Sequence, residues 1–210
     1  MPDASSSLDD QVRAADPDRW LSSRFVGDAQ ARADLIVLYA LEAELMSIPT
    51  RVTQPLLAEM RYAWWREQMG GVFSGMARKG HPVLEALTDV VARRSLPREP
   101  FDALIDAHID RVHGEPHDLN AFYVGPMQTA VRILIGHGHE RAVAEAGQVW
   151  GLMQVGRAET AVTVRADANR ALRKLPAAAF PAVAHAALKP DAPEPMKRLT
   201  LTWATLRGRI

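Results

Sequence analysis

Apolar positions recur along this chain at intervals of three and four residues, the spacing of one face of an α-helix. The clearest stripe is formed by Leu35, Leu38, Tyr39 and Leu45, and Glu42 falls on the same stripe. No strong alternation of apolar and polar residues, as in a half-buried strand, is present. The pattern therefore predicts an all-α fold.

Prolines and glycines divide this pattern into segments with short connections. Asp16 and Pro17 are suited to begin the first helix, Pro49 to end the second, and Gly70 with Gly71 to end the third. We predict helices at residues 18–25, 29–47, 53–69, 82–95, 99–113, 118–136, 139–160, 167–174, 178–188 and 195–206. This arrangement is typical of a helical bundle. Residues 1–15 are expected to be a disordered segment, and residues 16–210 a single domain.

The composition mainly excludes certain classes of protein and of functional site. Lys+Arg and Asp+Glu are both 25, and this zero net charge argues against a nucleic-acid partner. The absence of cysteine excludes a disulfide scaffold and a cysteine nucleophile. The longest apolar stretch, residues 35–41, is too short to span a membrane, and the N-terminus lacks the features of a signal peptide. We expect a cytoplasmic protein, for which peripheral membrane contact stays open.

The densest aromatic cluster lies in the third predicted helix, at Arg61, Trp64, Trp65 and Arg66. Arg61 and Trp65 are one helical turn apart, a spacing that suits a cation–π pair. The tryptophans either anchor helix packing or form the wall of an apolar groove with arginine at its mouth. The sequence leaves both interpretations open.

A second feature is the acidic stripe of Asp102, Asp106 and Asp110, spaced four residues apart on one helix face. Like charges at this spacing repel, so a basic side chain or a divalent cation is expected to compensate them. The stripe can equally be a solvated face. The histidines form only loose pairs, so the sequence predicts no metal site.

Three runs within residues 18–69 carry a family resemblance. They are Asp18-Arg19-Trp20-Leu21, the run Leu35 to Leu41 followed by Glu42 and Glu44, and Gln54-Pro55-Leu56-Leu57 continuing to Arg61 and Trp64-Trp65-Arg66. Over residues 16–125 the chain resembles the squalene/phytoene synthase family. The resemblance implies the all-α isoprenoid synthase fold, shortened here at its C-terminal end. Active members join two prenyl diphosphates head to head, with Mg²⁺ held by two Asp-rich motifs on facing helices.

The chain departs from the family at both metal motifs. The positions of the first motif hold Met46, Ser47 and Thr50, none of which is a carboxylate. The second motif should follow Gly151, where only Gln154, Arg157, Glu159 and Asp167 are found. Glu42 and Glu44 make the chain similar to a non-catalytic branch that includes a mitochondrial complex I assembly factor.

We therefore predict a non-catalytic protein without cofactor, catalytic residues or metal ligands. It would bind an isoprenoid-like lipid or a protein partner, and the resemblance implies a role in assembling a respiratory complex. The candidate surface consists of Tyr39, Glu42, Arg61, Trp64, Trp65 and Arg66. One alternative is a Mg²⁺-dependent prenyltransferase with unconventional ligands drawn from Glu42, Glu44, Asp102 and Asp106. Another is a structural or oligomerisation domain without a ligand.

Overall fold

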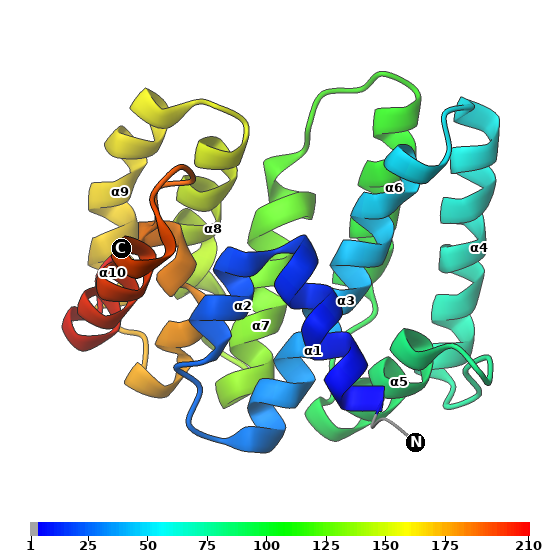
Figure 1. The fold of residues 1–210 in the computed structure, drawn as a ribbon, viewed down its shortest axis with the longest axis horizontal. Helices are drawn as coiled ribbons and strands as arrows, with labels where there is room; N and C mark the ends of the chain where they lie inside the picture. Colours follow the sequence, from blue (N-terminus) through cyan, green and yellow to red (C-terminus); the bar gives the residue numbers. More distant parts are fainter. Residues whose placement is uncertain (1–3) are drawn as a thin grey trace.

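The computed structural model describes residues 4–210, with side chains from residue 8 onward, and within that range it contains helices and no strand. The prediction of an all-α fold is confirmed (Figure 1). The elements are α1 Ala4–Ala15, α2 Pro17–Ser23, α3 Ala29–Arg51, α4 Pro55–Phe73, α5 Pro82–Arg94, α6 Glu99–Val112, the π-helical turn η1 Asn120–Val124, α7 Gly125–Ile135, α8 Glu140–Gln154, α9 Ala158–Leu172, the 3₁₀ turns η2 Ala177–Ala182 and η3 Ala184–Ala187, and α10 Glu194–Arg207. None of these helices combines the length and apolarity needed to cross a bilayer.

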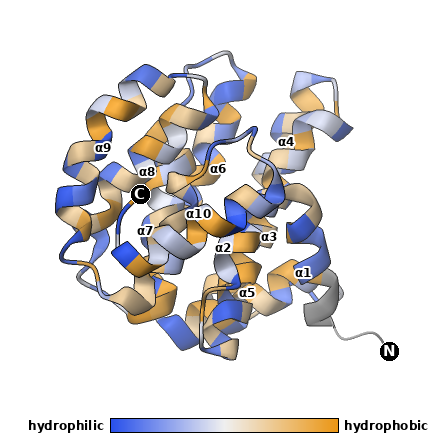
Figure 2. Cartoon of the chain, turned by 60° about the vertical axis from the view of Figure 1, so that its left-hand side comes forward, coloured by the Kyte–Doolittle hydropathy of each residue, from blue (hydrophilic) through white to orange (hydrophobic). Residues whose placement is uncertain are grey.

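The helix α3 forms the centre of the core. All of residues 35–41 are buried, on every side of the helix, and α1, α5 and α7 pack around it. A helix that is apolar all round is a core helix rather than a surface helix. The helices around it are amphipathic, and Figure 2 shows hydrophobic and hydrophilic residues alternating along them.

The predicted disorder of the N-terminal segment is wrong for residues 4–15, which form α1, while residues 1–3 lie outside the described part. Leu8 and Val12 are buried in the core, and α1 packs on α3. Asp9 holds the helix in place, because it accepts a hydrogen bond from Trp20 Nε1 at 2.9 Å and pairs with Arg24 at 2.6 Å. Burial of one apolar face stabilises a helix that its polar sequence alone does not indicate.

The second and third predicted helices both continue past their expected ends. α3 runs through Pro49 to Arg51, and α4 runs through its two glycines to Phe73. Proline removes one backbone hydrogen bond and leaves the carbonyl four residues earlier without its donor. That carbonyl belongs to Leu45, and the hydroxyl of Tyr62 donates to it at 3.1 Å. A contact with the next helix thus compensates for the proline inside α3.

The C-terminal part differs from the prediction in its boundaries. The segments predicted at 139–160 and 167–174 are the antiparallel pair α8 and α9, which meet at a turn around Gly156. Gly156 has a φ of +76°, a conformation that suits glycine, and this reverses the chain. Residues 178–188 form two short 3₁₀ turns instead of an α-helix.

Gly147 lies where α8 contacts η1, at a close approach of two backbones. A Cβ atom added there would stand 2.8 Å from Val124 Cα, so the backbones would have to separate. We expect Gly147→Ala to lower the free energy of unfolding by about 1–3 kcal/mol, measured by urea denaturation. Gly70→Ala is the matched control, because nothing lies within 4 Å of its added Cβ and alanine favours the helix. Equal stability of the two variants would contradict the close approach of η1 to α8.

Candidate functional site

A pocket of about 550 Å³ lies between α2, α3, α6, η1 and α8. Leu104, Phe122, Tyr123 and Trp150 give it an aromatic and aliphatic lining. Charged side chains from α2, α3 and α10 also line it, with Glu42 among them. The volume and the mixed lining are those of a small-molecule site.

A buried ion network joins α2 to α3 at this pocket. Arg19 Nε bonds Asp16 Oδ2 at 2.5 Å, and its Nη1 bonds Glu42 Oε2 at 2.6 Å. The guanidinium also lies over the ring of Tyr39, 4.6 Å from the centroid. Local structure fixes the network, because Asp16 is the N-cap of α2 and accepts a bond from the Arg19 amide at 2.9 Å. The predicted role of Asp16 as a cap is confirmed.

Burial and ion pairing together set the pKa values of Asp16, Arg19 and Glu42. Burial opposes the charge of Arg19, but Glu42 and Asp16 outweigh it and raise the pKa of Arg19, so it stays cationic. Burial also acts to raise the pKa of Asp16, yet Arg19 holds that pKa below its usual value. For Glu42 burial prevails over the attraction of Arg19, and its pKa is raised. Glu42 is therefore the member of the network that accepts a proton most readily.

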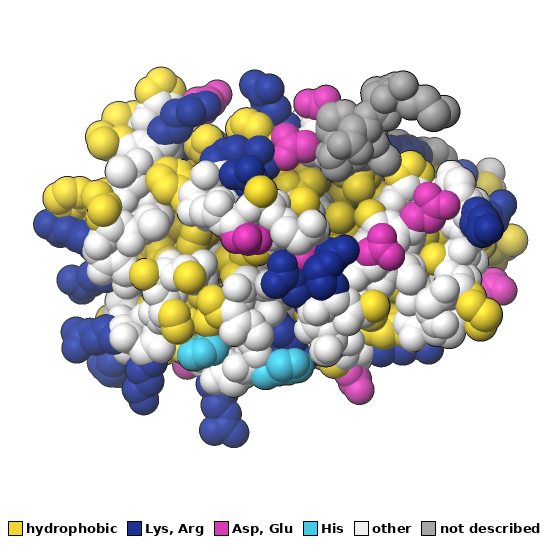
Figure 3. All heavy atoms as spheres, turned by 90° about the horizontal axis from the view of Figure 1, so that it is seen from below, with side chains coloured by type: hydrophobic (Ala, Val, Ile, Leu, Met, Phe, Trp, Pro, Cys, Tyr) yellow, Lys and Arg dark blue, Asp and Glu magenta, His cyan; other side chains and the backbone are white. Residues whose placement is uncertain are grey.

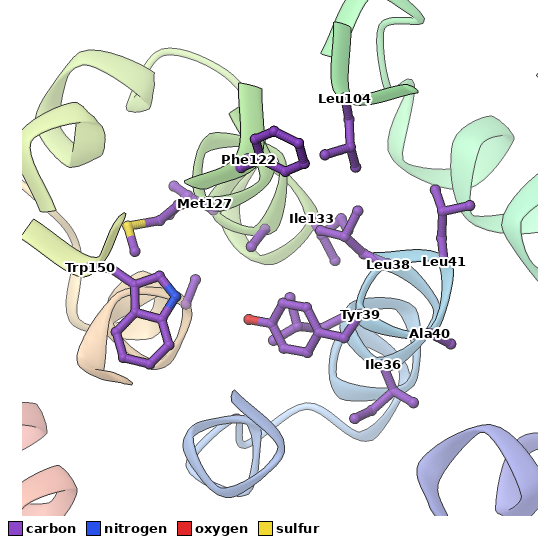
Figure 4. Close-up of a cluster of buried hydrophobic side chains, with 14 of the residues drawn as sticks. Ile36, Leu38, Tyr39, Ala40, Leu41, Leu104, Phe122, Met127, Ile133 and Trp150 are labelled. Carbon is purple, nitrogen blue, oxygen red and sulfur yellow. The ribbon is translucent and has the colours of Figure 1, made fainter. Parts of the chain in front are cut away.

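Two polar atoms beside this network have no hydrogen-bond partner. The Tyr39 hydroxyl and Glu42 Oε1 are both buried and unpaired. Burial raises the pKa of Tyr39, so its hydroxyl keeps its proton and can donate. A small space of about 10 Å³, lined by Tyr39, shares Arg19 and Trp150 with the pocket. Figure 4 shows the Tyr39 hydroxyl pointing from α3 into the space on the side of Trp150. Buried polar atoms are normally satisfied, so a water molecule or a polar ligand group is expected to bond these two atoms.

Two buried histidines border the same region. His108 lies between Tyr62, which it stacks at 4.9 Å, and Phe122, and the edge-on ring of Trp150 lies 4.9 Å from His185. Burial lowers the pKa of each to about 3, with Arg111 adding to the effect at His108 and Arg19 at His185. Both imidazoles are therefore neutral at pH 7.

The remaining cation of the pocket is Lys197 of α10. Its Nζ bonds Asp18 Oδ1 at 2.8 Å, so it too is already paired. The pocket therefore holds the acidic groups of Asp16, Asp18 and Glu42 against the two cations Arg19 and Lys197. An added anion would find no free positive charge in this lining.

In the structure the residues of the predicted candidate surface lie in three separate places. Tyr39 and Glu42 belong to the ion network, whereas Arg61, Trp64 and Trp65 line a different groove of about 590 Å³ between α3 and α4. Trp65 is buried and packs edge-on against Trp64 at 5.3 Å, so it anchors helix packing as well as lining the groove. Arg66 lies elsewhere, in an ion pair with Asp106.

The acidic stripe is compensated by arginines. Arg98 pairs with Asp102 at 2.9 Å and Arg66 pairs with Asp106, both on the exposed side of α6. Asp110 is on the same face of α6 and is exposed. None of the three lines the pocket.

The donor set of the pocket does not fit the Mg²⁺ ions that the resemblance implies. Met46 and Ser47, at two positions of the first motif, face the pocket from α3, and Gln154 faces it from α8. A thioether, a hydroxyl and an amide replace the carboxylates that Mg²⁺ prefers. Of the unconventional ligands considered, Glu42 alone lines the pocket. Among residues 8–210 no three His, Asp or Glu side chains gather in a metal-binding group.

Several residues of this site were not predicted as functional. Asp16 was predicted only as a cap, and Arg19 only as part of the run 18–21, because its partner Glu42 is 23 residues away. His108 and Trp150 lie on apolar helix faces and read as core residues. The family run at 18–21 was the one local signal that could have indicated Arg19.

Comparisons with known proteins agree with this fold. The family model described as squalene/phytoene synthase matches residues 12–123, more than half of the chain. The crystal structure of the squalene synthase HpnC from Alicyclobacillus acidocaldarius superposes with a TM-score of 0.71, covering 98% of this chain and 94% of that chain at 14% identity. This match supports the fold, including its C-terminal third. No curated protein matches the chain. With more than half of its length matched by the family model, the chain belongs to the squalene/phytoene synthase family.

Proposed function

We propose that this protein is a non-catalytic member of its family, and that its pocket binds the polar end of an uncharged isoprenoid-like lipid. The observation that carries the proposal is the pocket itself: Met46, Ser47 and Gln154 stand where the chemistry of the family needs carboxylates, while Tyr39 and Glu42 keep unpaired polar atoms beside it. Transfer of a prenyl group requires neutralisation of the diphosphate leaving group, which these side chains do not provide.

The charges of the pocket favour an uncharged head group. Arg19 and Lys197 are both paired with carboxylates, so a diphosphate would have to break an existing ion pair or remain unpaired. A hydroxyl group, in contrast, can accept a hydrogen bond from the Tyr39 hydroxyl and donate one to Glu42 Oε1 without displacing a charge. The aromatic lining then packs against the hydrocarbon chain.

The biological setting is part of the proposal. The likeness to the non-catalytic branch supports a role in assembling a respiratory complex, and the cytoplasm is the location that we propose. The alternative ligand is a protein partner. It would bind in the groove at Trp64 and Trp65, which is separate from the pocket.

The test compares farnesol with farnesyl diphosphate in the presence of Mg²⁺. We expect farnesol to bind about tenfold more tightly than the diphosphate, by isothermal titration calorimetry, because the diphosphate lacks a free cation in the pocket. No product of prenyl transfer should form during prolonged incubation. Ala43→Phe, in the pocket wall, should abolish farnesol binding, whereas Ala92→Phe on the exposed side of α5 should leave it unchanged.

Two results would overturn the proposal. Conversion of farnesyl diphosphate to a coupled product would establish the prenyltransferase alternative. Absence of binding by a correctly folded protein would favour the structural or oligomerisation domain.

A further inference from the structure

The last helix, α10, has two apolar faces, and the fold covers only one of them. Leu201 and Ala204 are buried, and the helix packs on α2, η2 and η3. A second stripe of side chains remains exposed. It consists of Met196 at 53%, Leu199 at 63%, Trp203 at 55% and Leu206 at 76% exposure.

The exposed side chains form one continuous stripe. Their spacing of three, four and three residues places them on the same side of the helix, away from Leu201. Scattered apolar side chains are normal on a protein surface, but a stripe along a whole helix indicates an interaction surface.

The charge of this helix indicates what covers the stripe. Within α10, Arg198 is paired with Glu194 at 2.6 Å and Lys197 with Asp18 at 2.8 Å, whereas Arg207 and Arg209 follow at the C-terminal end, where no acidic residue lies after Glu194. Arg207 lies over the ring of Trp203, 4.0 Å from its centroid, at the border of the stripe. In Figure 3 yellow and dark-blue side chains gather along the left-hand edge, the end of the molecule where Figure 1 places α9 and α10.

We propose that α10 binds in the plane of a bilayer surface that contains anionic lipid. An apolar stripe with a tryptophan, bordered by arginines, matches the acyl and head-group layers of such a surface. The inner face of α10 meanwhile contributes Lys197 to the pocket, so the bound helix holds the pocket beside the membrane. The inference does not depend on what the pocket binds.

Flotation of the full chain with phospholipid vesicles tests the proposal. We expect binding to phosphatidylcholine vesicles that contain phosphatidylserine, and roughly tenfold weaker binding to pure phosphatidylcholine or at high salt. Leu199→Gln with Leu206→Gln should lose binding about tenfold or more, because the apolar contribution is removed while helix propensity is kept. Arg207→Gln with Arg209→Gln should bind both kinds of vesicle equally.

The matched control removes apolar side chains from another exposed helix face. Leu56→Gln with Met60→Gln on α4 should float with the vesicles as the unmodified protein does, since these residues are 67% and 60% exposed but lie far along the chain from α10. Circular dichroism confirms that each variant is folded. The proposal is overturned if the unmodified protein does not float, or if the α10 variant floats as well as the α4 variant. A concentration-dependent dimer lost in the α10 variant, without vesicle binding, would assign the stripe to a contact between protein chains instead.

Discussion

Replacement of Arg19 by methionine is expected to lower the free energy of unfolding by about 3–5 kcal/mol at neutral pH. The reason is the environment of its two partners: Glu42 is buried at 4% exposure, Asp16 is partly buried, and both bond the same guanidinium. Without the cation, two carboxylates remain close together in a region of low dielectric constant, and one must take up a proton or the fold must open. Urea denaturation followed by circular dichroism measures the loss.

Two further measurements distinguish electrostatics from lost packing. The stability deficit should become smaller on going from pH 8 to pH 5, because protonation of Glu42 removes one of the uncompensated charges. The neutral triple variant Asp16→Asn, Arg19→Met, Glu42→Gln should recover most of the stability, since asparagine still caps α2 and no charge is buried.

An exposed ion pair provides the comparison. Arg66→Met removes the partner of Asp106, where both side chains are more than 40% exposed, so the loss should stay below about 1 kcal/mol. If the Arg19 and Arg66 variants lose similar amounts of unfolding free energy, the buried network stabilises the fold no more than an exposed ion pair does.

Acidification is the second change with a large expected effect. His108 and His185 have pKa values lowered to about 3 by burial, against an ordinary value of 6.5. Between pH 3 and pH 6.5 the two histidines are protonated in the unfolded chain but neutral in the folded protein. Their contribution to the free energy of unfolding is therefore fully present above pH 6.5 and is lost as the pH falls toward 3. Each histidine contributes up to about 1.4 kcal/mol per pH unit in this window.

The carboxyl groups of the pocket modify this slope without reversing it. Glu42, whose pKa is raised, gains relative stability on acidification below its folded pKa and offsets part of the loss. Asp16, whose pKa is lowered, adds to the loss below its ordinary value of 3.8. We therefore expect the urea midpoint to fall steadily from pH 7 to pH 4.

Substitution of the two histidines tests their part in the pH dependence. In a variant with His108→Phe and His185→Leu, the decrease in the free energy of unfolding between pH 7 and pH 5 should shrink to less than half. His137→Gln, at an exposed position, should keep the dependence of the unmodified protein. If the double variant has the same dependence on pH, other groups are responsible for it.

The sequence by itself determined the local features of this protein. Periodicity placed the central helix around Leu35 to Leu41, and Asp16 was identified as a cap. The absence of carboxylates at Met46, Ser47 and Thr50 was also visible in the sequence alone. These features depend on neighbours within about one helical turn, and that is the range over which spacing and capping rules act.

Only the tertiary structure decided which distant residues meet. It paired Arg19 with Glu42, placed His108 between two aromatic rings, buried His185 against Trp150, and assigned Trp65 to a groove away from the pocket. It also left the stripe of Leu199 and Leu206 on α10 uncovered. An apolar stripe in a sequence does not reveal whether another helix covers it. That outcome, like the protonation of a buried group, depends on packing between segments far apart in the chain.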